Sequence, residues 1–316
     1  MLHLDDEAVI ATLDWPSLVR ALRAGFRKGA ESPPRPHYNV TVPGERDATL
    51  LLMPAWMTGG HIGLKTVTVF PDNGRRALPA VSSHYLLMSA RDGRIVASLE
   101  AGELTSRRTA AASALASSYL SRPDASRLLI VGAGRMAPNL ALAHASVRPI
   151  ENVQIWARDM AKAEYLALQL GDTGLKATAA PVLEAAVSSA DIISCATLSE
   201  APLVLGEWLR PGCHLDLVGA FTPTMRETDD EALRRASVFV DTRAGATTEA
   251  GEIVQALEGG AIVAGDIQGD LFDLASGQVK GRRSTEEITL FKSVGCSLED
   301  LIAAELCFER SGGTNI

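Results

Sequence analysis

Residues 127–137 read Arg-Leu-Leu-Ile-Val-Gly-Ala-Gly-Arg-Met-Ala, and this segment constrains the fold more than any other. The apolar run Leu128–Val131 predicts a buried strand, the glycines after it predict a tight turn, and the alanine-rich stretch that follows predicts a helix. A strand, a glycine turn and a helix in this order let backbone N–H groups approach a pyrophosphate at the helix N-terminus. Ala137 stands in place of the third glycine of this fingerprint. The segment therefore predicts a dinucleotide site that includes Gly132, Gly134, Arg135 and Met136.

Strand-like and helical segments alternate from Leu128 onward, which predicts a doubly wound parallel sheet of the Rossmann type. Before this point, short strand-like runs are separated by turn signals, which indicates a strand-rich first domain. The amphipathic segment Leu298–Arg310 is expected to pack back on that first domain. We therefore predict an α/β protein with two domains. The first is discontinuous and covers residues 1–117 and 296–316, and the NAD(P)-binding domain covers residues 118–295.

Composition excludes several other classes of protein. The net charge of −8 argues against a surface that follows nucleic-acid phosphates. No apolar run approaches the roughly 20 residues that span a bilayer, and the acidic start does not resemble a signal peptide. The four cysteines and six histidines show no metal-ligand spacing. We expect a cytoplasmic protein that uses no metal and binds neither nucleic acid nor a membrane.

The end of the second strand of the alternating region decides between the two nicotinamide cofactors. An acidic residue there accepts hydrogen bonds from the free ribose 2′-hydroxyl of NADH, whereas arginine accommodates the 2′-phosphate of NADPH. The strand ends in Ala157, Arg158 and Asp159, so the acidic position holds alanine and a guanidinium follows it. Arg158 is alternatively a solvated charge at a strand end, and Asp159 is close enough in sequence to reach a ribose. The pattern favours NADPH and leaves NADH possible.

Motifs on both sides of the glycine turn give the chain a resemblance to the ornithine cyclodeaminase/mu-crystallin family over almost its whole length. The motifs are Met53-Pro54-Ala55, Gly63-Leu64-Lys65, Leu104–Ala111, the glycine turn, Gly206-Glu207-Trp208, Val218-Gly219-Ala220 and Phe291–Gly295. The resemblance implies a homodimer, in which a mixed-sheet α+β domain for substrate binding and dimerisation accompanies the Rossmann domain. It also implies an oxidoreductase of amino acid metabolism, closest in character to Δ1-pyrroline-2-carboxylate (ketimine) reductases.

The resemblance carries the family's contacts to the substrate carboxylate over to Arg35, Lys65 and Arg108. Cations in a partly dry cleft suit a carboxylate, because charge-assisted hydrogen bonds both bind and orient it. Lys65 and Arg108 are expected to be the catalytic pair, with Arg108 also near the cofactor. Arg107 and Arg108 are consecutive on a predicted helix and diverge by about 100°, so one of them faces the site, and the Arg-Thr-Ala-Ala match selects Arg108.

For the cofactor, the resemblance adds residues that contact it through backbone atoms or small side chains. Ala80 and Val81 are expected near the nicotinamide or its ribose. The other positions follow later strands, and they are Thr197, Val218, Ala220, Phe221 and Ser293.

One position departs from the cyclodeaminase pattern. Cyclodeaminases carry an aspartate in the loop after Val-Gly-Ala, and this chain has Phe221 there, with Met225 at the loop's lysine position. An ornithine ammonium would meet an apolar wall, whereas a ring of CH₂ groups would fit it. We therefore expect NAD(P)H-dependent reduction of Δ1-pyrroline-2-carboxylate or Δ1-piperideine-2-carboxylate to L-proline or L-pipecolate. The alternatives are an alanine dehydrogenase-like oxidoreductase, an ornithine cyclodeaminase, and an NADP(H)-binding, crystallin-like protein with little catalysis.

Overall fold

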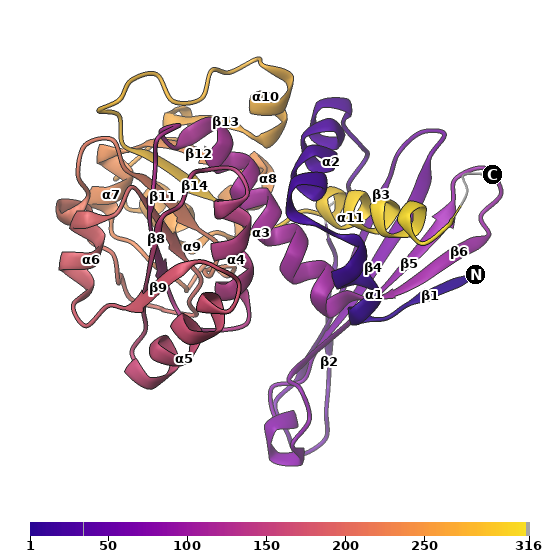
Figure 1. The fold of residues 1–316 in the computed structure, drawn as a ribbon. Helices are drawn as coiled ribbons and strands as arrows, with labels where there is room; N and C mark the ends of the chain where they lie inside the picture. The colour runs from indigo at the N-terminus through magenta and orange to yellow at the C-terminus, as the bar shows by residue number, and fades with distance from the viewer. Residues whose placement is uncertain (34, 314–316) are drawn as a thin grey trace. The chain divides into compact units, whose positions relative to one another are not determined.

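The computed structural model describes residues 1–33 and 35–313, which form an α/β fold (Figure 1). The chain divides into two compact units. Unit 1 contains Met1–Arg108 and Cys296–Ile316, and unit 2 contains Thr109–Gly295. The first boundary falls inside one helix, α3 (Ala101–Leu120), whereas the sequence placed the first boundary at 117/118. The C-terminal helix α11 (Ser297–Arg310) belongs to unit 1, as its amphipathic pattern indicated.

Unit 1 is a mixed sheet covered by helices. Within the described residues the sheet has six strands in the order β1-β6-β5-β4-β3-β2; β1 and β6 are parallel, and the other pairs are antiparallel. Helix α11 packs on β4 and β3 and against helix α2. The elements of the unit are β1 (Leu2–Leu4), α1 (Asp6–Thr12), α2 (Trp15–Lys28), β2 (His37–Val40), β3 (Ala48–Trp56), β4 (His61–Val69), β5 (Val81–Ser89) and β6 (Ile95–Glu100), with α11 at the end.

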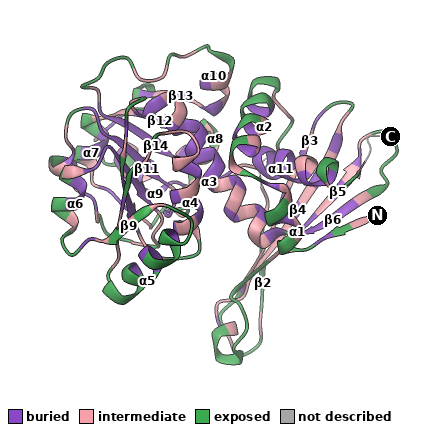
Figure 2. Ribbon diagram, in the orientation of Figure 1, coloured by how far each residue is buried: buried purple, intermediate pink, exposed green. Residues whose placement is uncertain are grey.

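The two faces of this sheet differ in burial. The face toward α11 carries Lys65 and Tyr85, which are register partners on β4 and β5 and are both buried. Because strand side chains alternate, Leu52, Leu64 and Leu86 lie on the opposite face, and all three are only half-buried in this chain. Half-buried residues are frequent along β3, β4 and β5 (Figure 2). Unit 1 therefore presents an apolar sheet face that its own helices do not cover fully.

Unit 2 is a doubly wound parallel sheet whose strands alternate with helices along the chain (Figure 1). In the described part of the chain its eight strands lie in the order β13-β12-β14-β11-β10-β7-β8-β9. The elements are β7 (Arg127–Val131), α4 (Met136–Ala145), β8 (Asn152–Trp156), α5 (Met160–Gly171), β9 (Lys176–Ala179), α6 (Leu183–Ser189), β10 (Ile192–Cys195), β11 (His214–Leu217), α7 (Asp230–Arg235), β12 (Ser237–Val240), α8 (Arg243–Glu249), α9 (Gly251–Glu258), β13 (Ile267–Asp270), α10 (Leu271–Ser276) and β14 (Thr289–Lys292).

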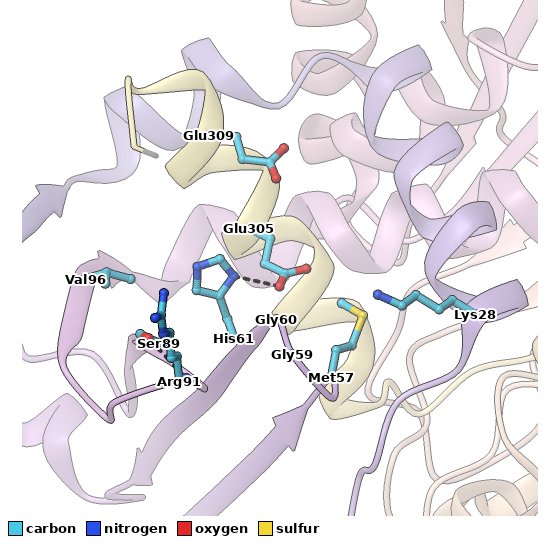
Figure 3. A pocket seen from close by; sticks show the side chains of 10 residues that line it. All are labelled: Lys28, Met57, Gly59, Gly60, His61, Ser89, Arg91, Val96, Glu305 and Glu309. Atoms are coloured by element: carbon cyan, nitrogen blue, oxygen red, sulfur yellow. Dashed lines mark hydrogen bonds and ion pairs between the residues drawn. The ribbon is translucent and has the colours of Figure 1, made fainter. Parts of the chain in front are cut away.

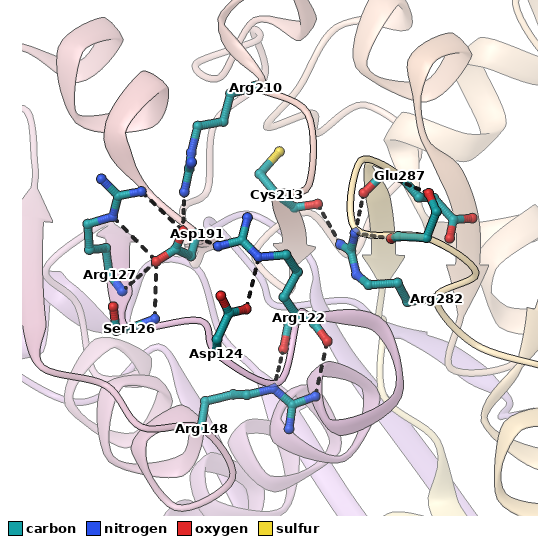
Figure 4. Close-up of polar contacts among 12 residues, drawn as sticks. Arg122, Asp124, Ser126, Arg127, Arg148, Asp191, Arg210, Cys213, Arg282 and Glu287 are labelled. Carbon is teal, nitrogen blue, oxygen red and sulfur yellow. Dashed lines mark hydrogen bonds and ion pairs between the residues drawn. The ribbon is translucent and has the colours of Figure 1, made fainter.

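One buried carboxylate organises the edge of this sheet at which the strands begin (Figure 4). Asp191, just before β10, accepts hydrogen bonds from the backbone N–H groups of Ser126 and Arg127 and from the side chains of Arg122, Arg127 and Arg210. Burial opposes the charge of Asp191, but the Arg127 side chain and these N–H groups outweigh it and hold its pKa below the usual range. Asp191 is therefore a structural acid, remote from the carboxyl ends of the strands where ligands of such sheets bind.

Helix α3 obtains its N-terminal cap from a distant part of the chain. It begins at Ala101, directly after β6. The carboxylate of Asp6, from α1, accepts a hydrogen bond from the backbone N–H of Glu103 at 2.9 Å. A distant part of the chain therefore supplies the acceptor that an N-terminal cap residue normally provides.

Candidate functional site

A cavity of about 440 Å³ lies in unit 2 at the carboxyl ends of β7, β8 and β10. This is the edge at which open α/β sheets bind their ligands. Six residues that the sequence assigned to the cofactor line the cavity: Gly132, Gly134, Ala157, Arg158, Asp159 and Thr197. The other lining residues are Ala133, Trp156, Lys162, Ala196, Leu198, Ser199 and Leu203.

The backbone of the glycine turn leaves no room for a side chain at Gly132, which allows a ligand to approach the main chain closely. Gly132 has φ +113°, a conformation that strains any other residue, and its N–H donates to the carbonyl of Trp156 at 2.8 Å. A Cβ atom at Gly132 would lie 2.7 Å from the carbonyl oxygen of Ala196. The side chain of Arg135 does not cap α4, and the first turn of the helix holds no acidic residue, so no carboxylate of that turn neutralises the positive end of the helix dipole. These features fit the diphosphate of a dinucleotide.

Two cations and one acid stand where β8 leads into α5. Arg158 and Lys162 both line the cavity, and Lys162 lies in the first turn of α5. The carboxylate of Asp159 accepts a hydrogen bond from the backbone N–H of Ala161 at 3.1 Å, so it caps that helix. Sequence patterns alone did not identify Lys162. Its place in the first turn of the helix that follows Arg158 and Asp159 was the available signal.

In unit 1, Lys65 and Arg108 meet at one carboxylate. The Nζ atom of Lys65 lies 2.7 Å from Oδ2 of Asp300, and the Nε atom of Arg108 lies 2.9 Å from Oδ1 of the same residue. The Nη1 atom of Arg108 also donates to Glu299 at 2.6 Å. Lys65 and Arg108 are only 2 % and 4 % exposed, and both acids are fully buried. The structure thus joins the two residues that the sequence selected as a catalytic pair.

Burial and the two acids, Asp300 and Glu299, shift the pKa values of Lys65 and Arg108. Burial disfavours the charge of Arg108, but Asp300 and Glu299 outweigh burial and raise its pKa further above its already high value. Burial lowers the pKa of Lys65 to about 8, with Asp300 opposing this and Arg108 reinforcing it. Asp300 keeps a lowered pKa because Arg108 and Lys65 outweigh its burial. The cluster therefore holds a permanent guanidinium beside an ammonium whose pKa is lowered to about 8.

Three different elements build this cluster. Lys65 is on β4, Arg108 is on α3, and the acids are in the first turn of α11. Arg107 points elsewhere: its guanidinium lies over the ring of Trp15 and donates to the carbonyl of Leu13. The helical divergence of Arg107 and Arg108 thus leaves only Arg108 at the acids.

Comparison with known proteins places the chain in a family. The family model described as "Ornithine cyclodeaminase/mu-crystallin family" matches residues 4–315. The chain belongs to the ornithine cyclodeaminase/mu-crystallin family. It is 40 % identical over 293 residues to the Δ1-pyrroline-2-carboxylate reductase of Paracoccus denitrificans, covering 92 % of this chain and 91 % of that protein.

Solved structures of two relatives have the same fold. The Δ1-pyrroline-2-carboxylate reductase of Thermococcus litoralis, in complex with NADH and L-proline, is 30 % identical with a TM-score of 0.92 and covers 100 % of both chains. An archaeal alanine dehydrogenase dimer with bound NAD is also 30 % identical, with a TM-score of 0.90, and covers 100 % of this chain and 97 % of that one. The whole chain, and not its Rossmann unit alone, thus follows the family fold.

A family motif residue has a clear packing reason in unit 1. Gly63 precedes Lys65 on β4, and a Cβ atom there would lie 1.7 Å from the hydroxyl oxygen of Tyr85. The ring of Tyr85 therefore occupies the space that any larger residue would need. No described residue forms a hydrogen bond with this buried hydroxyl, and burial raises the pKa of Tyr85.

Three other predicted residues of unit 1 lie outside the cluster. Arg35 is half-buried in the segment before β2, and its predecessor Pro34 is outside the described residues. Ala80 and Val81 stand exposed at the start of β5. The roles assigned to these three residues remain predictions.

The remaining predicted residues lie at the carboxyl edge of unit 2. Val218, Ala220 and Phe221 follow β11, and Phe221 is 49 % exposed. Ser293 follows β14, and its hydroxyl donates to the buried carboxylate of Asp241 at 3.1 Å. Arg135 and Met136 begin α4. These positions agree with an edge that holds a dinucleotide, and their individual roles remain predictions.

Unit 1 contains a second cavity, of about 490 Å³, toward the C-terminal half of α11 (Figure 3). His61 and Glu305 line it, and Nδ1 of His61 lies within hydrogen-bond distance, 2.9 Å, of Oε1 of Glu305. None of the residues that the sequence assigned to substrate or cofactor lines this cavity. Its position thus separates it from the Lys65–Arg108 cluster, which meets the first turn of α11.

Residues 1–33 and 35–313 contain neither a membrane-spanning helix nor a metal-binding cluster. In this range no helix has the length and apolar character needed to cross a membrane. The same range shows no cluster of three or more histidine, cysteine, aspartate or glutamate side chains placed to hold a metal ion.

Proposed function

We propose that the protein reduces a cyclic imino acid, Δ1-pyrroline-2-carboxylate or Δ1-piperideine-2-carboxylate, to the corresponding L-amino acid with a nicotinamide cofactor. The observation that carries this proposal is the convergence of Lys65 and Arg108 on Asp300. The likeness to the Δ1-pyrroline-2-carboxylate reductase that was solved with NADH and L-proline supports the same reaction.

The cluster has hydrogen-bond donors left for a substrate carboxylate. The ammonium of Lys65 has three N–H donors, and Asp300 is its one ion-pair partner among the described residues. Arg108 donates through Nε and Nη1, and no described residue accepts from its Nη2. Asp300 and Glu299 orient the two cations, so the α-carboxylate of the imino acid meets groups already in place. Arg35 is proposed as a third cation for the same carboxylate.

The loop after β11 supports a ring substrate. Phe221 stands where cyclodeaminases have an aspartate, and half of its surface is open. An apolar ring at this position favours the CH₂ groups of a pyrroline or piperideine over the side-chain ammonium of ornithine, which it can neither pair nor deprotonate.

The cavity of unit 2 is proposed to hold NADPH in preference to NADH. When bound, the nicotinamide supplies the hydride that reduces the C=N bond. Arg158 and Lys162 line the cavity and suit a 2′-phosphate. One carboxylate oxygen of Asp159 accepts the hydrogen bond that caps α5. The proton that completes the reduction comes from Lys65 or from solvent, because the pKa of Lys65 near 8 makes it able to donate near neutral pH.

The active protein is proposed to be a homodimer in a reducing compartment such as the cytoplasm. The apolar sheet face with Leu52, Leu64 and Leu86 is a surface that a second copy would cover, and the similar alanine dehydrogenase is described as a dimer. Buried thiols at Cys195 and Cys213 agree with reducing conditions.

The test is an assay of the purified protein with synthetic imino acids. Wild-type protein is expected to oxidise NADPH when given Δ1-pyrroline-2-carboxylate and to form L-proline, identified by chiral chromatography. The Lys65→Ala variant is expected to lose most of this activity. If the variant keeps wild-type activity, Lys65 has no part in the reaction, and if the wild type forms no proline from any imino acid, the proposed function is wrong.

A further inference from the structure

A buried carboxylate joins two loops at the edge of the dinucleotide cavity. Glu227 lies in the loop after β11 and is fully buried. Its Oε1 atom accepts hydrogen bonds from the backbone N–H of Thr197 at 2.6 Å and from the Thr197 hydroxyl at 2.8 Å. Its Oε2 atom accepts from the backbone N–H of Gly219 at 2.8 Å. Thr197 follows β10 and Gly219 follows β11, so a single side chain fixes the ends of two neighbouring strands.

The backbone of the same residue holds a further part of the cavity wall. The carbonyl oxygen of Glu227 accepts hydrogen bonds from the N–H groups of Leu203 and Val204, at 2.9 and 3.0 Å. Thr197 and Leu203 both line the cavity. Glu227 thus bonds to two separate segments of the wall without lining the cavity itself.

A second acid, Glu252, contacts Glu227, and a lysine, Lys292, contacts Glu252. Glu252, in the first turn of α9, accepts a hydrogen bond from the backbone N–H of Glu227 at 2.8 Å. The Nζ atom of Lys292, the last residue of β14, lies 3.1 Å from Oε2 of Glu252, and all three side chains are fully buried. Burial raises the pKa of Glu227 and the neighbouring Glu252 adds to this, whereas Lys292 opposes it. Three hydrogen-bond donors on its oxygens favour the ionised carboxylate that the two loops require.

We propose that Glu227 is a positioning residue for the dinucleotide, which sets the spacing of the loops after β10 and β11 and so shapes the cavity that receives the cofactor. The proposal rests on the dinucleotide site of the proposed function and does not depend on which imino acid is reduced. Asp191 offers a matched comparison, because it is another buried acid of the same sheet that binds several donors at the opposite ends of the strands.

The experiment compares Glu227→Gln with Asp191→Asn in the full-length protein. NADPH affinity is measured by calorimetry without any imino acid, and thermal stability is measured in parallel. Glu227→Gln turns one oxygen into an N–H group that faces a donor, and hydrogen bonds to charged groups are strong. We expect the NADPH dissociation constant of Glu227→Gln to rise by about tenfold or more, with a matching rise in KM for NADPH. Asp191→Asn is expected to lower the melting temperature and to leave NADPH affinity unchanged.

The proposal is overturned if Glu227→Gln binds NADPH as tightly as wild type while it loses stability as Asp191→Asn does. Should Glu227→Gln fail to fold, Thr197→Val and Thr197→Ser replace it. Valine removes the hydroxyl that donates to Glu227, and serine retains it, so weaker NADPH binding is expected for valine alone. Equal binding by the two Thr197 variants would also refute the proposal. Intact NADPH binding by a wild-type protein that reduces no imino acid would refute the proposed function instead.

Discussion

The ammonium of Lys65 lies 2.7 Å from the carboxylate of Asp300, and both groups are buried in unit 1. Asp300 also accepts from Arg108 at 2.9 Å, so one acid orients both cations that we propose for the substrate carboxylate. Burial of a lysine is costly unless a partner compensates its charge. The pair therefore explains how a strand lysine remains charged on the face of the sheet that α11 covers.

Replacement of Asp300 is expected to impair substrate binding as well as stability. Asp300→Asn leaves Lys65 without its counter-charge, and breaking a buried ion pair costs about 3–5 kcal/mol. We expect a lower free energy of unfolding, measured by urea denaturation, and a KM for the imino acid that rises by about tenfold or more. The control is Arg94→Gln, which removes the exposed pair of Arg94 with Asp92 and should change stability by no more than about 1 kcal/mol. An Asp300→Asn variant with a wild-type KM would contradict the role of Asp300.

The pH dependence of KM should reveal the titration of Lys65. Burial lowers the pKa of this lysine to about 8, so the ammonium is present below this pH and is lost as the pH rises through it. Only the ammonium attracts the substrate carboxylate, and we therefore expect KM for the imino acid to increase above about pH 8 in wild-type protein. Lys65→Arg stays charged over this range and should not show that increase. The substrate titrates identically in both assays, so identical pH profiles would exclude Lys65 as the group responsible.

The cofactor preference should depend on Arg158 and Lys162. Removal of either cation by substitution with alanine is expected to raise KM for NADPH by about tenfold, because charged hydrogen bonds to a phosphate are lost. KM for NADH should not change, since NADH lacks the 2′-phosphate. Initial-rate kinetics with both cofactors measure the effect. The phosphate role is refuted if wild-type protein prefers NADH, or if the variants lose NADPH and NADH to the same extent.

The apolar face of the unit 1 sheet should control assembly. Leu64 is half-buried on that face, and Leu64→Glu would place a charge in the proposed interface between two copies. We expect wild-type protein to sediment as a dimer and Leu64→Glu to sediment as a monomer in analytical ultracentrifugation. Ile10→Glu is the matched control, because Ile10 is 45 % exposed on α1 and should leave the dimer intact. A monomeric wild type, or a dimeric Leu64→Glu variant, would contradict the interface.

Local sequence patterns predicted the strands and turns whose determining residues are consecutive in the chain. The strands with apolar runs, such as Leu128–Val131, were found because a strand buried on both faces is continuously apolar. Three short strands of unit 2 were missed, because polar residues or glycine interrupt any apolar run in them: Lys176–Ala179 (β9), Ile267–Asp270 (β13) and Thr289–Lys292 (β14). The glycine turn was placed correctly because its chemistry lies within a few consecutive residues.

Partners that are distant in sequence escaped prediction. Asp300 and Glu299 follow the Phe291–Gly295 motif and look like ordinary acids in the first turn of a helix, and only the fold brings them to Lys65 and Arg108. The same holds for Glu227, whose bonds to Thr197 depend on the order of strands in the sheet. A single sequence does not record such pairings, because their energies arise after the elements have packed.

The most direct test of the proposed reaction is a competition among substrates for wild-type protein. NADPH oxidation with Δ1-pyrroline-2-carboxylate and Δ1-piperideine-2-carboxylate is compared with NADPH oxidation in pyruvate plus ammonia, and ammonia release from ornithine is measured in parallel. We expect a kcat/KM for one of the cyclic imino acids that exceeds the value for pyruvate by about 100-fold or more, which corresponds to about 2.7 kcal/mol of transition-state stabilisation. We expect no ammonia from ornithine. Ammonia release from ornithine, or faster turnover of pyruvate than of both imino acids, would contradict the account.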